Sequence, residues 1–346
     1  MGTREPRVSV NSDRSKLVKW DDLDMVTISN PTLGEIKRAA NALIDGHLVA
    51  FPTETVYGLG ADATNEKAVS RIYSVKGRPT SHPLIVHISS IEQLENWAKN
   101  IPDYAIKLAR EFWPGPMTLI LKRSPLAKDF ITGGQDNVGL RVPANPIALE
   151  LLTEFEKIGG VGIAAPSANR FGAVSPTTSE AVEEEIGKFL DQEDSILNGG
   201  PCRVGIESTI IDCTEDSPRV LRPGVITEKM IENCLSTKLF SSNEDIKMKF
   251  SGSFKSHYSP KAQVKLSGLA QPGDGFIALS KIATPSGAIR LASPRDVNQY
   301  AAQIYSALRL GDAKGIKTIV VIPPEGSGLE VAIADRITKA ASQICT

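Results

Sequence analysis

The sequence is poor in cysteine and histidine and lacks any long apolar run. The four cysteines are scattered without a Cys-x-x-Cys pair, and the four histidines show no spacing typical of metal ligands. We therefore expect neither a disulfide framework nor a structural zinc ion, and no metal site built from protein side chains alone. The first residues carry charges and no stretch suited to a signal peptide or a membrane span. These absences favour a cytoplasmic protein that does not bind a membrane.

An excess of charge of either sign is also missing. The 39 Lys and Arg residues face 40 Asp and Glu residues, which gives a formal net charge of −1. Such a chain has no overall attraction to nucleic acid, so any basic site must be local. With 346 residues, of which 41% are hydrophobic, the chain is long enough for two domains that each bury a core.

Patterns of helices and strands alternate along most of the chain. A polar extension covers residues 1–25, and a first α/β domain covers residues 26–235. The serine-rich residues 236–261 have no long apolar run and predict an interdomain linker. Residues 262–346 predict a smaller parallel α/β domain, with strands near 263–266, 276–279, 288–291 and 318–322 and helices at 296–310 and 329–341.

Local signals set several boundaries in the first domain. A capping box at Thr32-Leu-Gly-Glu35 predicts a helix that Gly46 stops, and a second helix runs from about Asn65 to Lys76. Ser89-x-x-Glu92 predicts the start of another helix, and one more spans about 103–112. Strands are expected at 47–51, 84–88, 117–121, 138–142, 161–165, 195–197, 209–212 and 219–221.

The strand at 47–51 opens onto Pro52-Thr-Glu-Thr-Val-Tyr-Gly-Leu-Gly60, and the following helix ends in Lys76-Gly-Arg78. Hydroxyls and glycines at the end of a strand leave donors available, and the two cations add positive charge. The pair of features favours a site for phosphate or carboxylate. Taken singly, each also fits an ordinary turn or a solvated helix end.

A second strand ends at Ala164-Ala-Pro-Ser-Ala-Asn169, where Ser167 and Asn169 offer a hydroxyl and an amide. The layout matches the first loop, and ligands of open α/β sheets bind at such edges, although a turn or helix cap would also use Asn. Strand alternation points Arg141 away from its apolar neighbours, and it points His87 away in the same manner. For His87, a partly buried structural histidine is nearly as good an interpretation as a ligand.

P-loop and nucleophile-elbow motifs are missing from the sequence. Positioning and charge neutralisation would therefore have to carry catalysis.

Several motifs together resemble the L-threonylcarbamoyladenylate synthase family and its YrdC-like domain. They occupy residues 51–59, 76–79, 83–87, 113–118, 141–143, 165–169, 207–209 and 221–224. The resemblance covers about residues 30–235, and His257-Tyr-Ser-Pro260 with the following domain resembles the long, two-domain type of the family. It implies a twisted mixed sheet with surrounding helices, followed by a smaller Rossmann-like parallel α/β domain.

The same resemblance implies a nucleotidyltransferase that makes threonylcarbamoyl-AMP and pyrophosphate from L-threonine, bicarbonate and ATP. The product would serve the N6-threonylcarbamoyladenosine modification of tRNA through downstream transfer machinery, with at most weak binding of tRNA itself. Mg²⁺ would accompany ATP. By the resemblance, Lys76 and Arg78 would be catalytic and would bind ATP together with Thr118, Ser167, Asn169, Ser175, Arg222 and Tyr258. L-Threonine would bind to Thr53, His87, Arg141, Ala165 and Ser208, with Arg141 on its carboxylate, while Tyr258 would reach over the cleft from a linker that acts as a lid.

Three other interpretations remain open at this point. A basic cleft could accept an RNA backbone, although the net charge disfavours this. A YrdC-like domain also occurs in a carbamoyltransferase of hydrogenase maturation, but that protein would bring Cys-x-x-Cys zinc motifs, which this chain lacks. Finally, the second domain could be a scaffold only, since its sequence offers no evident ligand motif.

Overall fold

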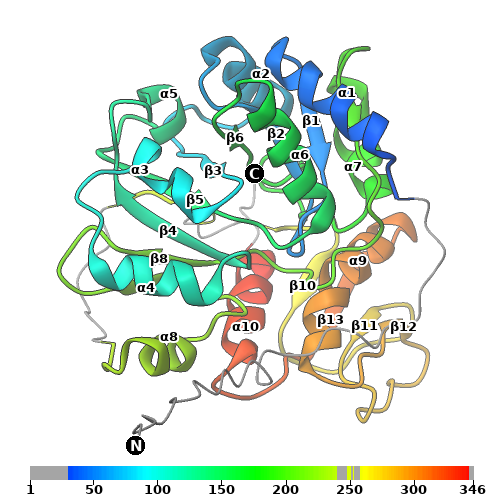
Figure 1. Cartoon of the computed structure of the whole chain (residues 1–346). Coiled ribbons are helices and arrows are strands. Elements are labelled where there is room, and N and C mark those ends of the chain that lie inside the picture. The colour runs from blue at the N-terminus through cyan, green and yellow to red at the C-terminus, as the bar shows by residue number, and fades with distance from the viewer. Residues whose placement is uncertain (1–29, 240–247, 251, 253–257, 343–346) are drawn as a thin grey trace, which may run out of the picture.

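The computed structural model describes residues 30–239, 248–250, 252 and 258–342, and within them the chain folds into two sheets with flanking helices (Figure 1). The large sheet is mixed and has nine strands, and the small one has four. This agrees with the fold class predicted from the sequence. The polar extension at 1–25 and linker residues 253–257 lie outside the described part.

The first helices begin and end where the sequence predicts. In α1 (Leu33–Ile44), the Thr32 hydroxyl accepts the Glu35 N–H and the Glu35 carboxylate accepts the Thr32 N–H at 2.7 Å. Helix α2 (Glu66–Lys76) starts at the Asn65 cap and ends at Gly77, whose φ is 61°.

The helix start expected at Ser89 is wrong. A 3₁₀ turn at Ile91–Gln93 follows Ser90 instead and leads into the short α3 (Leu94–Trp97). The Ser89 hydroxyl is unavailable as a cap because it donates to the carboxylate of Glu156 on another helix.

The large sheet has the order β7-β1-β2-β6-β3-β5-β4-β8-β9. Strand β2 was not expected from the sequence, and β6 is shorter than the predicted strand at 161–165. Gly60 of β2 approaches its neighbours so closely that a Cβ there would lie 2.7 Å from Ile163 and 2.8 Å from Phe51. The strands are β1 (Val49–Phe51), β2 (Gly58–Asp62), β3 (Ile85–His87), β4 (Met117–Lys122), β5 (Asn137–Arg141), β6 (Ile163–Ala164), β7 (Ser195–Ile196), β8 (Thr209–Asp212) and β9 (Arg219–Arg222).

Helices cover the two faces of this sheet unequally. Val86 and Leu140 point into the main core, which α2 and α4 (Asp103–Phe112) close. On the other face, α1 and α6 (Pro146–Lys157) pack over Phe51 and Ile163. That face continues past these two helices toward His87 and Arg141, where a cavity lies. The remaining helices of the first domain are α5 (Asp129–Thr132), the 3₁₀ turn Gly187–Phe189, α7 (Ser179–Ile186) and α8 (Glu228–Leu235).

The second sheet is parallel throughout, as the sequence predicts, in the order β10-β13-β11-β12. Its strands are β10 (Gln263–Lys265), β11 (Gly275–Ile277), β12 (Ile289–Ala292) and β13 (Thr318–Val321), and its helices are α9 (Val297–Ala313) and α10 (Leu329–Ala341). The helices of the described residues are too short or too polar to cross a membrane.

The two domains share an apolar core. Val56, Val204 and Ile206 of the first domain pack in one cluster with residues of α9 and α10, which lie below the centre of the large sheet in Figure 1. Gly205 touches α9 directly, because a Cβ there would lie 2.5 Å from the carbonyl oxygen of Ala301, and its φ is 78°. A side chain at this position would push the domains apart.

Candidate active site

A cavity of about 50 Å³ lies over the face of the large sheet that α1 and α6 leave uncovered, beside the second domain, and most of the side chains that line it are buried. Its floor comes from two neighbouring parallel strands: Ile85 and His87 of β3, and Arg141 of β5, which is in register with His87. The loops that follow β1 and β6 form one wall. Because β2 runs antiparallel to both of these strands, their carboxyl ends reach the same edge of the sheet, as the sequence suggests.

The structure brings most of the predicted site residues to this cavity. Those that line it are Thr53, Arg78, His87, Arg141, Ala165, Ser167, Ser208, Arg222 and Tyr258. Four others lie behind the wall. Lys76 contacts Ser167, Thr118 contacts Ser208, Ser175 contacts Glu207, and Asn169 bonds to its own loop.

Thr53 folds the first loop around its own hydroxyl. This oxygen accepts the N–H groups of Thr55 and Val56, both at 3.2 Å, and lies 2.6 Å from the Val56 carbonyl, to which it donates. The hydroxyl is therefore tied to the backbone at the cavity wall. The next residue, Glu54, was not assigned to the site from the sequence, but it pairs with Arg141.

Glu54 holds Arg141 by an ion pair of 2.7 Å, and its second carboxylate oxygen accepts the Ala144 N–H at 3.0 Å. Both side chains are almost fully buried. The Arg141 Nε is buried and has no hydrogen-bond partner among the described residues. The guanidinium is thus fixed in direction and keeps a donor for an anion, which suits a carboxylate ligand.

His87 is a buried, neutral imidazole beside this arginine. Burial, with a smaller contribution from the Arg141 charge, lowers the pKa of His87 to about 3. Its ring meets Phe51 edge-on at a centroid distance of 5.9 Å, and its Nδ1 has no partner among the described residues. At neutral pH, His87 can donate or accept a hydrogen bond but does not add charge.

Lys76 and Arg78 are both buried, at the edge where the second loop lies. The Lys76 ammonium donates to the carbonyl oxygens of Ser167, at 2.6 Å, and Asn169. Burial holds the pKa of Lys76 well below its usual range and lowers that of Arg78 to about 10. Arg78 donates to the Pro83 carbonyl at 3.0 Å, while its Nε is without a partner among the described residues. Only Arg78 of the two lines the cavity.

The opposite wall is built around Ser208. Arg222 at the end of β9 donates to the Ser208 carbonyl from Nε (3.1 Å) and a terminal nitrogen (2.9 Å), and to the Ser208 hydroxyl at 3.2 Å. The same hydroxyl lies 2.8 Å from that of Thr118. Burial lowers the pKa of Arg222. These contacts place a guanidinium and two hydroxyls side by side.

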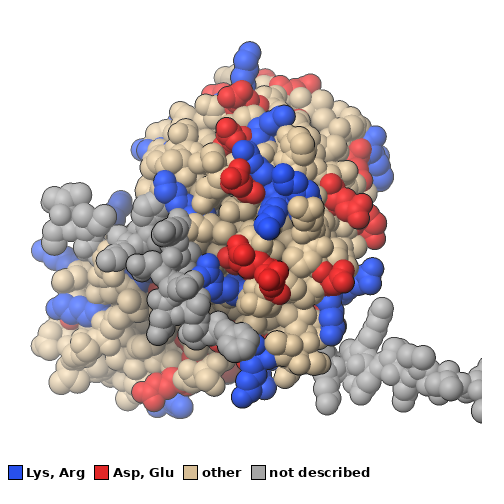
Figure 2. Space-filling view, turned by 90° about the vertical axis from the view of Figure 1, so that its left-hand side faces the viewer, with Lys and Arg blue, Asp and Glu red and all other residues tan. Residues whose placement is uncertain are grey.

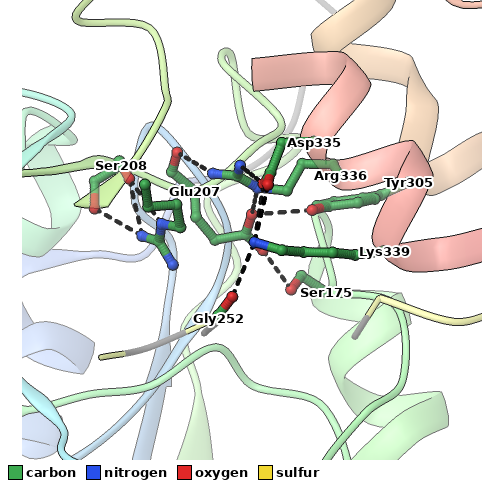
Figure 3. Close-up of polar contacts among 9 residues, drawn as sticks. Ser175, Glu207, Ser208, Gly252, Tyr305, Asp335, Arg336 and Lys339 are labelled. Carbon is green, nitrogen blue, oxygen red and sulfur yellow. Dashed lines mark hydrogen bonds and ion pairs between the residues drawn. The ribbon is translucent and has the colours of Figure 1, made fainter. Parts of the chain in front are cut away.

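Residues of the second domain reach this wall through Glu207 (Figure 3). The Glu207 carboxylate accepts from Ser175 at 2.7 Å, from Tyr305 of α9 at 2.9 Å and from Arg336 of α10 at 2.8 Å. Burial opposes ionisation of Glu207, but the charges of Arg336 and Arg222 and the hydrogen bonds outweigh it and lower its pKa to about 2. Tyr258 stacks on Tyr305 at 5.6 Å.

Sequence reasoning missed Arg336 and Tyr305. One signal was available for Arg336, because it stands on the buried stripe of α10 formed by Ala332, Ile333, Ile337 and Ala340. An arginine on an apolar helical face must find a partner, since a buried unpaired charge is very costly. The pattern of α10 predicts a carboxylate partner but does not identify it as Glu207.

The cavity has the lining of an anion site in an α/β protein, with a neutral histidine and a paired arginine on its floor and further arginines on its walls. A family model described as "Telomere recombination", which groups Sua5, YciO and YrdC, matches residues 41–224. A second model, for the C-terminal domain of threonylcarbamoyl-AMP synthase, matches residues 226–342.

Relatives match over nearly the whole chain. Threonylcarbamoyl-AMP synthase of Pyrococcus abyssi is 40% identical over 328 residues, which are 88% of this chain and 94% of the relative. The enzyme of the same name from Bacillus subtilis is 36% identical, over 94% of this chain and 98% of its own. The crystal structure of Pyrococcus abyssi Sua5 complexed with L-threonine has a TM-score of 0.81 at 37% identity, and covers 90% of this chain and 96% of that one. The chain belongs to the threonylcarbamoyl-AMP synthase family.

Proposed function

We propose that this protein forms threonylcarbamoyl-AMP and pyrophosphate from L-threonine, bicarbonate and ATP, and so supplies the threonylcarbamoyl group for N6-threonylcarbamoyladenosine in tRNA. The observation that carries the proposal is the cavity itself. It joins a floor suited to an amino acid, His87 and Arg141, to walls that carry Arg78 and Arg222. The similar Pyrococcus abyssi structure was solved with L-threonine.

In this proposal the two ends of the cavity bind different ligands. Arg141, oriented by Glu54, would take the carboxylate of L-threonine, and the neutral His87 beside it would hydrogen bond the same ligand. Thr53, Ala165 and Ser208 would complete the threonine site. The phosphates of ATP would meet Arg78, Arg222 and Ser167, and behind them Lys76, Thr118, Asn169 and Ser175 would hold these groups in place.

The reaction needs charge stabilisation more than proton transfer. The amine nitrogen of threonine first forms a bond to the carbon of bicarbonate, and water leaves, which gives a carbamate. An oxygen of this carbamate then forms a bond to the α-phosphorus of ATP, and the bond from that phosphorus to the pyrophosphate oxygen breaks. Negative charge grows on the departing pyrophosphate. Buried guanidinium groups such as Arg78 and Arg222 stabilise this charge strongly, because little water screens them.

Mg²⁺ would arrive with ATP as part of the substrate and neutralise phosphate charge. Among the described residues, His, Cys, Asp and Glu side chains form no group of three that could hold a metal ion. Glu207 lines the cavity and Glu54 lies behind its wall on Arg141, and each of these carboxylates is paired with an arginine. In this proposal the metal ion is therefore carried by the phosphates.

The test is release of pyrophosphate from ATP in the presence of bicarbonate and L-threonine, with L-serine in place of threonine as the control. We expect release that requires threonine and bicarbonate together. Release that does not depend on threonine, or no release with all substrates present, contradicts the proposal. Mass spectrometry of the product then checks for threonylcarbamoyl-AMP.

Direct RNA binding is not favoured as a second function. Figure 2 shows one face of the molecule. Where grey residues do not cover this face, basic and acidic side chains are interspersed and no broad basic surface is visible.

In this proposal, a transferase that acts after this enzyme would bind the tRNA and consume the adenylate. The cytoplasmic location expected from the sequence stays a prediction.

A further inference from the structure

Arg336 is a completely buried side chain of the second domain that reaches into the first. Its Nε lies 2.8 Å from Oε2 of Glu207, and a terminal nitrogen donates to the Glu207 carbonyl oxygen at 3.3 Å. Its other terminal nitrogen pairs with Asp335 at 2.6 Å (Figure 3). Both the carboxylate and the backbone of Glu207 are therefore fixed by one residue of α10.

Glu207 lines the cavity, and the next residue is Ser208, which Arg222 contacts. A buried carboxylate at this place would repel an anionic ligand if it lacked a cation of its own. It would also attract Arg222, which is close enough to favour the charged form of Glu207. Pairing with Arg336 offsets the negative charge of Glu207, while Arg222 bonds to the Ser208 carbonyl and not to the Glu207 carboxylate.

The same arginine also supports Tyr258. Its guanidinium carbon lies 5.6 Å from the centre of the Tyr258 ring, on which Tyr305 stacks. Tyr258 has a left-handed backbone with a φ of 62°, which is unfavourable for a tyrosine, so surrounding contacts must hold it there. Arg336 and Tyr305 thus fix two parts of the cavity wall, Glu207 and Tyr258.

We propose that Arg336 is a positioning residue for the nucleotide: it neutralises Glu207 and holds Tyr258, so that Arg222, bonded to Ser208, keeps the arrangement in which it meets a phosphate group. The second domain is then part of the active site without touching the substrate. The inference rests on the proposed function in one respect, because it takes ATP to be the anionic ligand.

The test compares ATP binding by titration calorimetry in wild-type protein, Arg336→Met, Arg336→Lys and the double variant Arg336→Met/Glu207→Gln. We expect Arg336→Met to raise the Kd for ATP about tenfold or more, because it leaves a buried carboxylate unpaired beside the phosphates. Arg336→Lys, which keeps the charge, should raise it only about threefold. The double variant should bind ATP more tightly than Arg336→Met, because the repelling carboxylate is gone.

Arg290→Met is the matched control. The Arg290 guanidinium donates to the carbonyl oxygens of Leu279, Ile282 and Ala292, all inside the second domain and away from the cavity. This variant should lower the Tm and leave the Kd for ATP unchanged. A role of Arg336 as mere support for folding predicts that both variants lower the Tm and neither changes ATP binding.

The inference is overturned if Arg336→Met binds ATP within about twofold of wild type, if Arg290→Met weakens binding as much, or if the double variant is no better than Arg336→Met. Should Arg336→Met fail to fold, Arg336→Lys decides, and an unchanged Kd overturns the inference. If wild type binds ATP but releases no threonine-dependent pyrophosphate, the proposed function fails while the comparison of Kd values still decides on Arg336. Wild type that does not bind ATP overturns both.

Discussion

The ammonium nitrogen of Lys76 lies 2.6 Å from the carbonyl oxygen of Ser167 and also donates to that of Asn169. The last residue of α2 is thereby joined to the loop that follows β6. Since Ser167 lines the cavity and Lys76 does not, the lysine holds the loop that faces the ligand. The resemblance implies that Lys76 also binds ATP, and this stays a prediction.

Replacing Lys76 tests two roles together, holding the loop that follows β6 and binding ATP. We expect Lys76→Ala to lower kcat/KM for ATP roughly 10-fold to 150-fold, because it removes charge-assisted hydrogen bonds worth about 1.5–3 kcal/mol. Lys67→Ala is the matched control, an exposed lysine on the same helix, and should change kcat/KM by less than about twofold. Initial rates of pyrophosphate release at varied ATP provide the measurement. Equal effects of the two changes would show that Lys76 is dispensable.

Arg141 should matter to threonine and much less to ATP. Arg141→Lys keeps the charge but loses the planar fork, so we expect the KM for threonine to rise about tenfold or more, and the KM for ATP to change by less than about twofold. Arg123→Lys is the control, because Arg123 pairs with the exposed Asp129 outside the cavity. Rates at varied threonine and fixed ATP check this. A parallel rise of both KM values would contradict separate sites for the two substrates.

His87 should stay neutral throughout the physiological range. Burial lowers its pKa from 6.5 to about 3, so between these values the unfolded chain binds a proton that the folded chain does not. Proton uptake by the unfolded chain therefore lowers the stability of the folded protein as the pH falls from 6.5 towards 3. In NMR spectra, the His87 ring signal, assigned by its loss in His87→Gln, should not shift between pH 5 and 8. An inflection within that range would refute the neutral, buried histidine.

Much of this architecture could be predicted because the signals are local. Strand alternation placed His87 and Arg141 opposite their apolar neighbours, and both line the cavity. The caps Thr32 and Asn65 set the starts of α1 and α2. In the second domain, the alternation of strand and helix patterns predicts a parallel sheet, which the structure confirms.

What could not be predicted depends on contacts between distant residues. Strand β2, Gly58–Asp62, has two glycines and little β-branched character, and only pairing with β1 and β6 makes it a strand. Glu207 and Arg336 are 129 residues apart and meet only because the two domains share a core. The ion pair of Glu54 with Arg141 spans 87 residues in the same way.

Tyr258 supplies the remaining prediction, because it is 1% exposed and yet lines the cavity. If its ring closes the nucleotide side, Tyr258→Leu should raise the KM for ATP about tenfold, since the stacking on Tyr305 is lost, while Tyr258→Phe should stay within about threefold. Tyr300→Leu is the control: this equally buried tyrosine donates to the Ile322 carbonyl at 3.0 Å and does not line the cavity. Both leucine variants should lose stability, on the order of 2–4 kcal/mol, so thermal unfolding must be followed beside the rates. If Tyr258→Leu lowers the Tm as Tyr300→Leu does but leaves the KM for ATP unchanged, the tyrosine is a core residue and the linker does not act as a lid through it.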